Sequence, residues 1–232
     1  MKNRIVLVAA AFAAALGLAP VASASTKVAA DWEMNESAGA TVMHDSAGSH
    51  NGKIVQPNSQ ITIGKGTYTW KNRCPACLPV DKSRVIQVPD SSALEIPDAS
   101  VTYSLEFRFK TTHPFGNYMQ KGQSSTRGGQ IKVQGPKGKV QCLFKGAKGV
   151  RVGTGSGRAL DDGSWHTVRC VRTATQVQEF VDGTKVATKN GSTGPISNSS
   201  PFTVGGKLGC DQVKVTCDYY SGSMDWIKVS HG

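Results

Sequence analysis

Residues 161–188, DDGSWHTVRCVRTATQVQEFVDGTKVAT, decide the fold class. They contain two runs of alternating polar and apolar residues, WHTVRCVR and QVQEFVDG, separated by the short segment TAT. Alternation with a period of two is typical of strands that bury one face. The dipeptide Asp182-Gly183 then leads into TKVAT, and Asp-Gly favours the tight turn of a β-hairpin. The stretch therefore predicts consecutive antiparallel strands.

Trp165 and His166 stand at the start of the first of these strands, where they could form part of a site or of the framework. No serine or cysteine nucleophile pattern lies near His166. A tryptophan at the start of a strand more often packs than takes part in chemistry. We therefore expect Trp165 to be a buried framework residue and His166 to contribute little to stability.

The rest of the chain repeats the same pattern in short alternating runs such as SVTYSLEFRFKT, KVQCLFKG and SGSMDWIKVS. Gly, Pro, Asn or Ser interrupts the runs about every ten residues, and helical periodicity is nearly absent. Many short strands with regular turns are typical of an all-β sandwich or barrel. No internal repeat or linker divides the chain, so we expect one module.

The N-terminal residues 1–24 form a predicted secretory signal peptide. Lys2 and Arg4 precede an apolar run that Gly and Pro interrupt, and Ala22-Ser23-Ala24 is a small-residue cleavage pattern. The alternative, a membrane anchor, lacks a basic stop-transfer cluster after the run. We expect residues 25–232 to be one secreted, extracellular domain, and no later segment is apolar enough to span a bilayer.

Six cysteines in a secreted chain indicate disulfides. We expect neighbours to pair, as Cys74–Cys77, Cys142–Cys170 and Cys210–Cys217. The CPAC motif at Cys74 could instead be a redox pair, but it stands in a loop rich in Gly, Lys and Pro rather than between a strand and a helix. A zinc site has less support, because no second Cys or His pair lies at ligand spacing.

Several motifs resemble laminin-G-like domains of the concanavalin A-like lectin/glucanase superfamily. The stretch DGSWHTVRC…VQEFVDGTKVA resembles the W-H-x-V…Y-V-D-G-x-x-V pattern of these domains. ADWEMNESAGATVMHDSAGSHNGKI, VIQVPDSSALEIPDASVTYSLEFRFKT, PFTVGG and YYSGSMDWIKV resemble other segments in the family's order, so the match covers residues 31–229. The resemblance implies a jelly roll of two antiparallel sheets and a framework role for Trp165.

The glucanases of this superfamily carry paired carboxylates as E-x-D-x-x-E on one strand, where alternation puts them on one face. None of the glutamates of this chain has that spacing: Glu33, Glu36, Glu95, Glu106 and Glu179. We therefore expect no enzyme activity of this type. Glu179 is unusual because it lies between Val177 and Val181, and a buried carboxylate needs a partner. We expect either a salt bridge to a strand arginine or a place in a cleft.

Calcium is the metal that the resemblance implies. Asp45 in HDSAG matches the family's D-S-S-G turn, and Asp225 in GSMDW matches its closing aspartate. Carboxylates and loop carbonyls are the oxygen ligands that calcium prefers. We expect Asp45 and Asp225 to be the ligands of a structural calcium ion. The alternatives are an Asx turn at Asp45 and a hydrogen-bonded core acid at Asp225.

Charge is distributed unevenly along this chain, whose formal net charge is +11. No acidic residue occurs between Glu106 and Asp161. The same segment contains eleven basic residues, namely Arg108, Lys110, Lys121, Arg127, Lys132, Lys137, Lys139, Lys145, Lys148, Arg151 and Arg158. We expect strand pairing to gather them on one side of the sandwich, where they would attract anions. The alternative is an ordinary solvated face.

The expected ligand site combines cations with aromatic rings: Lys121, Arg127, Lys132, Lys139, Tyr118, Tyr68 and Trp70. Basic side chains would hold carboxylate, sulfate or phosphate groups while rings stack on sugar faces. The sequence thus predicts a non-catalytic module for a polyanionic glycan or cell-wall polymer. A structural or adhesive domain with a protein partner is the alternative, followed by a hydrolase. Nucleic acid has less support, because no nucleic-acid-binding motif is recognised.

Overall fold

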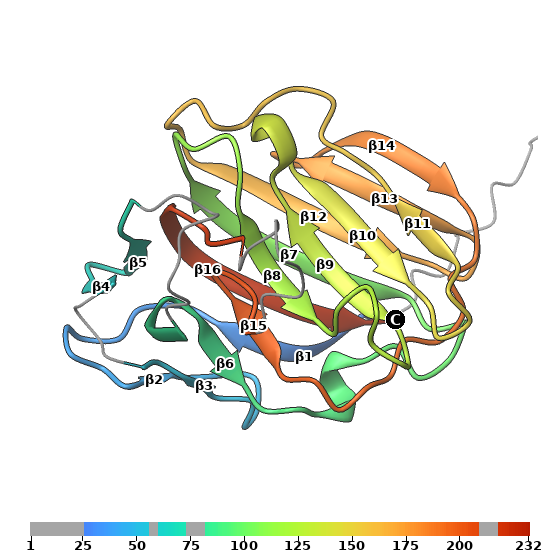
Figure 1. Ribbon diagram of the computed structural model, residues 1–232, viewed down its shortest axis with the longest axis horizontal. Helices are drawn as coiled ribbons and strands as arrows, with labels where there is room; N and C mark the ends of the chain where they lie inside the picture. Colours follow the sequence, from blue (N-terminus) through green and yellow to red (C-terminus); the bar gives the residue numbers. More distant parts are fainter. Residues whose placement is uncertain (1–25, 56–59, 73–81, 209–217) are drawn as a thin grey trace, which may run out of the picture.

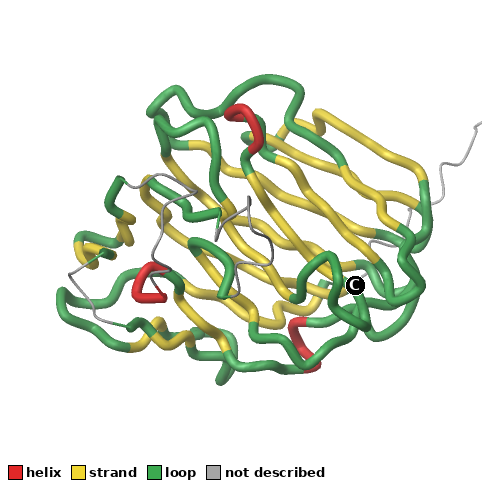
Figure 2. Tube along the Cα trace, viewed as in Figure 1, coloured by secondary structure: helices red, strands yellow, loops and turns green. Residues whose placement is uncertain are grey.

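The computed structural model describes residues 26–55, 60–72, 82–208 and 218–232 (Figure 1). The expected signal peptide and the expected pairs Cys74–Cys77 and Cys210–Cys217 lie outside the described residues. Strands dominate the described part of the chain, and its helices are single 3₁₀ turns (Figure 2). These turns are η1 (Lys82–Arg84), η2 (Ser92–Leu94) and η3 (Pro136–Gly138).

The described strands form two antiparallel sheets, which are stacked as layers (Figure 1). The first sheet has the order β14-β13-β12-β7-β16-β5-β4, and β1 also pairs with β16. Its strands are β1 (Lys27–Trp32), β4 (Ile61–Gly64), β5 (Thr67–Trp70), β7 (Tyr103–Lys110), β12 (His166–Arg172), β13 (Gln176–Val181), β14 (Thr184–Asn190) and β16 (Gly222–His231).

The second sheet has the order β11-β10-β9-β8-β15-β6-β3-β2. Its strands are β2 (Val42–Met43), β3 (Gly52–Lys53), β6 (Ile86–Val88), β8 (Asn117–Lys121), β9 (Gln130–Gln134), β10 (Gln141–Lys145), β11 (Arg151–Gly153) and β15 (Phe202–Val204). Two stacked antiparallel sheets confirm the predicted all-β jelly-roll sandwich.

The stretch that decided the fold class forms β12, β13 and β14 in consecutive antiparallel register, as predicted. Asp182 and Gly183 both have positive φ, 51° and 79°, between β13 and β14. Two successive residues with positive φ are what a type I′ hairpin turn requires, and Asp and Gly tolerate this conformation well. The local sequence therefore specifies this edge of the first sheet.

The core lies between the two sheets. In β7, Tyr103, Leu105, Phe107 and Phe109 are fully buried, while the residues between them are half-buried. This period of two is the alternation that the sequence shows.

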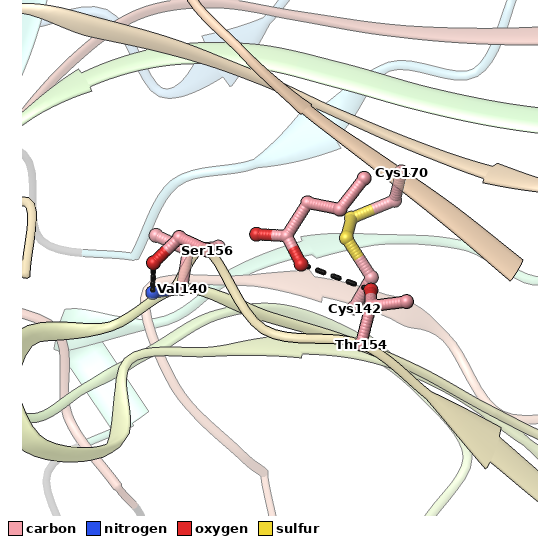
Figure 3. Close-up of a disulfide and its surroundings, with 6 residues drawn as sticks. Val140, Cys142, Thr154, Ser156 and Cys170 are labelled. Carbon is pink, nitrogen blue, oxygen red and sulfur yellow. Dashed lines mark hydrogen bonds between the residues drawn. A yellow bond between two sulfur atoms is a disulfide. The ribbon is translucent and has the colours of Figure 1, made fainter. Parts of the chain in front are cut away.

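One disulfide joins the two layers. Cys142 of β10 and Cys170 of β12 are bonded, with their Cα atoms 5.6 Å apart, and neither is exposed (Figure 3). The predicted Cys142–Cys170 pair is therefore confirmed. Because β10 and β12 belong to different sheets, the bond ties the two layers together at this end of the sandwich.

Glu179 lies directly opposite Cys170 in the β12–β13 register and is fully buried. Its Oε2 atom accepts a hydrogen bond of 2.9 Å from the Thr154 hydroxyl, and its Oε1 atom has no partner among the described residues. Burial raises the pKa of Glu179 to about 7, although the Thr154 hydrogen bond lowers it. The expected arginine salt bridge and the expected cleft position are both wrong, because the side chain points between the sheets.

The prediction for Trp165 and His166 is also wrong, because their burial is reversed. His166 is only 6% exposed, and its Nδ1 and Nε2 atoms lie 2.9 Å from Asp182 and 3.2 Å from Asp162. Trp165 is half-buried, with the Arg108 guanidinium 4.8 Å from its ring centroid. His166 thus links two turns, whereas Trp165 lies on the outer face of the first sheet.

We predict that Glu179→Gln stabilises the protein at neutral and alkaline pH. The folded-state pKa of Glu179, about 7, lies above the ordinary value of 4.5. The stability that the protonated carboxyl contributes is complete below about pH 4.5 and is lost as the pH rises through about 7. The variant avoids this loss, about 3 kcal/mol at about pH 8. Denaturant unfolding of both proteins across this pH range measures the difference.

The exposed Glu33 provides the matched control for this measurement. Glu33→Gln should leave the pH dependence of the unfolding free energy unchanged. The free energy of unfolding of Glu179→Gln and of the unaltered protein could instead fall in parallel between about pH 5 and about pH 8. The ionisation of Glu179 would then not cause the loss of stability.

We further predict that His166→Ala destabilises the protein more than Trp165→Ala does. The histidine change removes two hydrogen bonds to the carboxylates of Asp162 and Asp182. Because solvent screens these half-exposed partners, the loss in the free energy of unfolding should be about 2 kcal/mol. The tryptophan change removes cation–π contacts at a solvent-facing position, a loss of about 1 kcal/mol. Thermal and denaturant unfolding of both variants give the order. A larger loss for Trp165→Ala would restore the buried-framework interpretation.

Candidate functional site

The outer face of the second sheet carries a continuous row of polar side chains. In β9, Ile131 and Val133 point into the core and are 1% exposed, so Gln130, Lys132 and Gln134 point outward. The same alternation in β10 turns Gln141, Leu143 and Lys145 outward, on the face opposite the buried Cys142 and Phe144. The motifs GQIKVQ and KVQCLFK therefore build one surface from two neighbouring strands.

Backbone register determines which of these side chains are neighbours. Gln134 lies opposite Gln141, and its side-chain amide donates a hydrogen bond of 2.6 Å to the Gln141 carbonyl. Lys132 lies opposite both Gln120 of β8 and Leu143 of β10. Because cross-strand neighbours on one face lie about 5 Å apart, these residues form a compact lining.

The outward side chains form the floor of a cleft with a volume of about 420 Å³. Lys207, Asp218 and Ser124, the last from the loop between β8 and β9, contribute to its lining as well. The described lining residues are Gln120, Ser124, Gln130, Lys132, Gln134, Gln141, Leu143, Arg151, Gly153, Lys207 and Asp218. A volume above about 300 Å³ is typical of sites that take small molecules or short polymer segments.

The described lining of the cleft is polar and contains charges of both signs. Lys132, Lys207 and Arg151 line it, and Asp218 is the only carboxylate among the described lining residues. The Asp218 Oδ2 atom lies 2.8 Å from the Lys207 Nζ atom and 3.2 Å from the Lys132 Nζ atom. Asp218 is only 2% exposed, so its contacts hold the two lysines in fixed positions at the rim. Arg151 is exposed at the opposite edge, on β11.

The four cations predicted to bind a ligand have different positions. Lys132 lines the cleft, whereas Arg127 and Lys139 are exposed and lie outside its described lining. Lys121 is fully buried, where its Nζ atom pairs with Asp90 and lies 3.6 Å from Glu95. The prediction of Lys121 as a ligand-binding residue is therefore wrong, because internal carboxylates already neutralise it.

The eleven basic residues between Glu106 and Asp161 do not share one side of the sandwich, so that expectation is wrong as well. Arg108 and Lys110 belong to β7 in the first sheet, and Lys132, Lys145 and Arg151 belong to the second. The chain crosses from one layer to the other between β7 and β8. Only part of the predicted positive segment therefore reaches the cleft.

The predicted stacking role of Tyr68, Trp70 and Tyr118 is wrong, because all three side chains are at most 2% exposed. Tyr118 packs edge-on against Phe109, with ring centroids 4.9 Å apart. The Trp70 indole N–H donates a hydrogen bond of 2.8 Å to the Arg84 carbonyl. These rings are core residues that cannot stack on a ligand without unfolding.

Asp45 and Asp225 do not form the expected calcium site. The Asp45 carboxylate accepts hydrogen bonds from the backbone N–H groups of Asp31, Ala47 and His50, at 2.8, 3.0 and 3.0 Å, and from the His50 ring. Burial raises its pKa, but these hydrogen bonds together lower it below the ordinary value. Asp225 pairs with Arg108. Donors thus occupy both oxygens of Asp45 and the Oδ2 atom of Asp225.

No cluster of three or more His, Cys, Asp or Glu side chains suited to a metal occurs in the part of the chain that the structure describes. The residues present therefore do not fit a calcium ion held by Asp45 and Asp225.

The most informative residues that sequence analysis missed are the neutral amides Gln120, Gln130, Gln134 and Gln141. A search for charged and aromatic residues does not select neutral amides. The alternation in GQIKVQ could have identified two of them, because it places Gln130 and Gln134 on the same face of the strand as Lys132. A glutamine side chain both donates and accepts hydrogen bonds, so this face can bind hydroxyl groups.

Solved structures with the same fold include the binding domains of two toxins. The binding domain of botulinum neurotoxin serotype G matches 89% of this chain and 47% of its own, at 11% identity and a TM-score of 0.59. The binding domain of Paraclostridial Mosquitocidal Protein 1 matches 88% and 47%, at 11% identity and a TM-score of 0.58. Domains LG4-5 of the mouse laminin α1 chain match 60% and 40%, at 17% identity and a TM-score of 0.48.

The chain thus spans less than half the length of each of these three structures. Among curated protein sequences, none matches it. The family model described as the concanavalin A-like lectin/glucanases superfamily, of the laminin G type, matches residues 81–231. Since this match covers more than half of the sequence and agrees with the two-layer fold, the chain belongs to the concanavalin A-like lectin/glucanases superfamily.

Proposed function

We propose that this protein is a secreted, non-catalytic binding module, and that the cleft on the outer face of β8–β11 binds an anionic carbohydrate or cell-wall polymer. The observation that carries the proposal is the lining of the cleft, where glutamine amides stand beside cations on a rigid sheet. In a secreted protein such a cleft faces polymers outside the cell. The disulfide between the sheets suits this environment.

The lining supports a carbohydrate because amides match the dual chemistry of hydroxyl groups. Gln134 and Gln141 already pair with each other through one amide N–H and one carbonyl. Each retains further donor or acceptor capacity that a sugar hydroxyl can use. The backbone ladder between β9 and β10 fixes the distance between them, so a ligand does not have to order flexible loops there.

The cations support an anionic ligand. Lys132, Lys207 and Arg151 are the cations of the described lining, and Arg151 is exposed to solvent at its edge. Arginine can bind a carboxylate or sulfate through two parallel hydrogen bonds, and lysine acts as a compact positive charge. A polymer with repeated negative groups would therefore bind across the strands from Arg151 toward Lys207.

The acidic side chains of the cleft support binding rather than hydrolysis. A glycoside hydrolase generally uses two carboxyl groups on opposite sides of the scissile bond. Asp218 is the only described carboxylate in the lining, and its Oδ2 atom is already shared by two lysines. This pairing favours a structural role for Asp218.

A protein partner is the second candidate, and the outer face of the first sheet favours it. Trp165, Phe180 and Trp226 are half-buried there, beside Arg108 and Arg169. Aromatic and arginine side chains are enriched at protein interfaces. No helix within the described residues is long and apolar enough to cross a membrane.

We predict that changing Lys132 and Arg151 together to Gln weakens binding to polygalacturonate at least about tenfold, because charge-assisted hydrogen bonds contribute about 1.5–3 kcal/mol each. Binding by the unaltered protein should weaken with added salt, which screens the exposed charges. Dextran, a neutral polymer, should bind more weakly and with little dependence on salt. Isothermal titration calorimetry at low and high salt measures these differences.

The control variant is Lys185→Gln with Lys189→Gln, two exposed changes on β14 of the first sheet that remove the same charge outside the described lining of the cleft. It should bind polygalacturonate like the unaltered protein. If both double variants lost affinity equally, total charge rather than the cleft would be responsible. If the protein bound neither polymer, the carbohydrate proposal would fail and the protein-partner candidate would replace it.

A further inference from the structure

A second cleft lies where β1 passes η2 and the end of β16, apart from the cleft on β8–β11. Its volume is about 410 Å³. The described lining residues are Lys27, Val28, Ala29, Ala47, Gly48, His50, Ser92, Ala93, Pro97 and His231. They come from β1, the loop between β2 and β3, η2 and the C-terminal end of β16. Three of them are basic, and none is acidic.

His50 is held in a fixed orientation at one side of this cleft. Its Nδ1 atom lies 2.9 Å from the Asp45 Oδ2 atom. Hydrogen bonds from the backbone fix the Asp45 carboxylate and favour its charged form, so His50 Nδ1 carries the proton and donates it. The Nε2 atom of His50 is not used by any described residue. The side chain is 19% exposed, so Nε2 is available to a ligand.

His231 contributes a second imidazole to this cleft. Its Nε2 atom is buried and has no hydrogen-bond partner among the described residues. His231 lies opposite Lys27 of β1 and opposite Tyr103 of β7. Burial and the positive charge of Lys27 both lower the pKa of His231. A buried polar nitrogen without a partner is costly, so the site favours a group that supplies the missing hydrogen bond.

The charges around His231 leave an anion as the complementary group. Lys27 faces it from β1, Tyr103 faces it from β7, and His50 lines the same cleft from the loop after β2. The η2 residues in the lining, Ser92 and Ala93, add a hydroxyl and a methyl group but no charge. An anion near Lys27 would remove the repulsion that opposes protonation of His231.

We propose that the cleft between β1, η2 and the end of β16 binds a small carboxylate or phosphate group together with one proton. Lys27 neutralises the anion, protonated His231 donates a hydrogen bond to it, and His50 contacts a neighbouring polar group of the ligand. Val28, Ala29 and Pro97 form an apolar wall for the rest of the ligand. The proposal does not depend on the cleft on β8–β11.

The test uses glucuronate and inorganic phosphate as probes, with glucose as the neutral control. Glucuronate keeps its single charge over this pH range, so a change in its affinity reports protonation of the protein. Glucuronate should bind about tenfold more tightly at about pH 5.5 than at about pH 8. This factor corresponds to a rise of about one unit in the pKa of His231 on binding, with uptake of a proton. Calorimetry gives the affinities, and NMR of the imidazole protons shows which histidine is protonated.

Four variants assign the effect. His231→Gln should abolish its pH dependence, and Lys27→Gln should weaken glucuronate binding at both pH values. His113→Gln, a half-buried histidine outside the described lining, should leave both unchanged. Lys132→Gln with Arg151→Gln should also retain this binding, which separates it from the function proposed above.

The probes also separate the sources of the ligand. Binding of glucuronate alone would indicate the acidic end of a saccharide, and binding of both anions a general carboxylate or phosphate group. If His231→Gln unfolds, the NMR titration of the unaltered protein decides, since the His231 resonance must move toward the protonated form when glucuronate is added. Binding of neither anion, affinity independent of pH, or equal binding of glucose would overturn the proposal.

Discussion

The packing of Phe107 and Phe109 against Tyr118 joins the two sheets, and the rest of the structure depends on it. The first two rings come from β7 and the third from β8, so the contact closes the step where the chain passes between layers. Each aromatic pair contributes about 0.5–1.5 kcal/mol beyond the burial of its area. Tyr220 extends the cluster, with its ring 5.0 Å from Tyr118. These rings lie between the sheets, whereas amides and cations line the cleft on the outer face of the second sheet.

Sequence patterns predicted the parts of the fold that depend on local alternation. The strands β12, β13 and β14, the turn at Asp182 and the Cys142–Cys170 bond follow from period, turn chemistry and spacing. Alternation shows which residues share a face, but it does not show which face is buried. The sequence therefore puts Tyr118 and Lys132 in one expected site, whereas in the structure Tyr118 points into the core and Lys132 points into the cleft.

The same limit explains why the site was only partly predicted. Arg108 and Arg151 belong to the same basic segment of the sequence, but they lie in different sheets of the sandwich. This separation becomes visible only when the pairing of the strands is known. His166 gains its importance from Asp162 and Asp182, whose turns meet around its ring. Contacts between segments that are apart in sequence decide these roles, and one sequence does not contain the distances. The position of Lys132 in the lining of the cleft could be predicted, because its charge and its outward place in the alternation are both local properties.

The proposed binding surface and the core lie on opposite faces of the same strands. In β9, a change at Lys132 or Gln134 alters the outer face, and a change at Ile131 alters the core. The register between β9 and β10 fixes how far Gln134 lies from Gln141, so the spacing of the amides is a property of the backbone ladder. Under the proposed function, a ligand with hydroxyls at a matching spacing would be selected by the same hydrogen bonds that hold the sheet together. Selectivity in the proposed site would then follow from strand register as much as from side-chain identity.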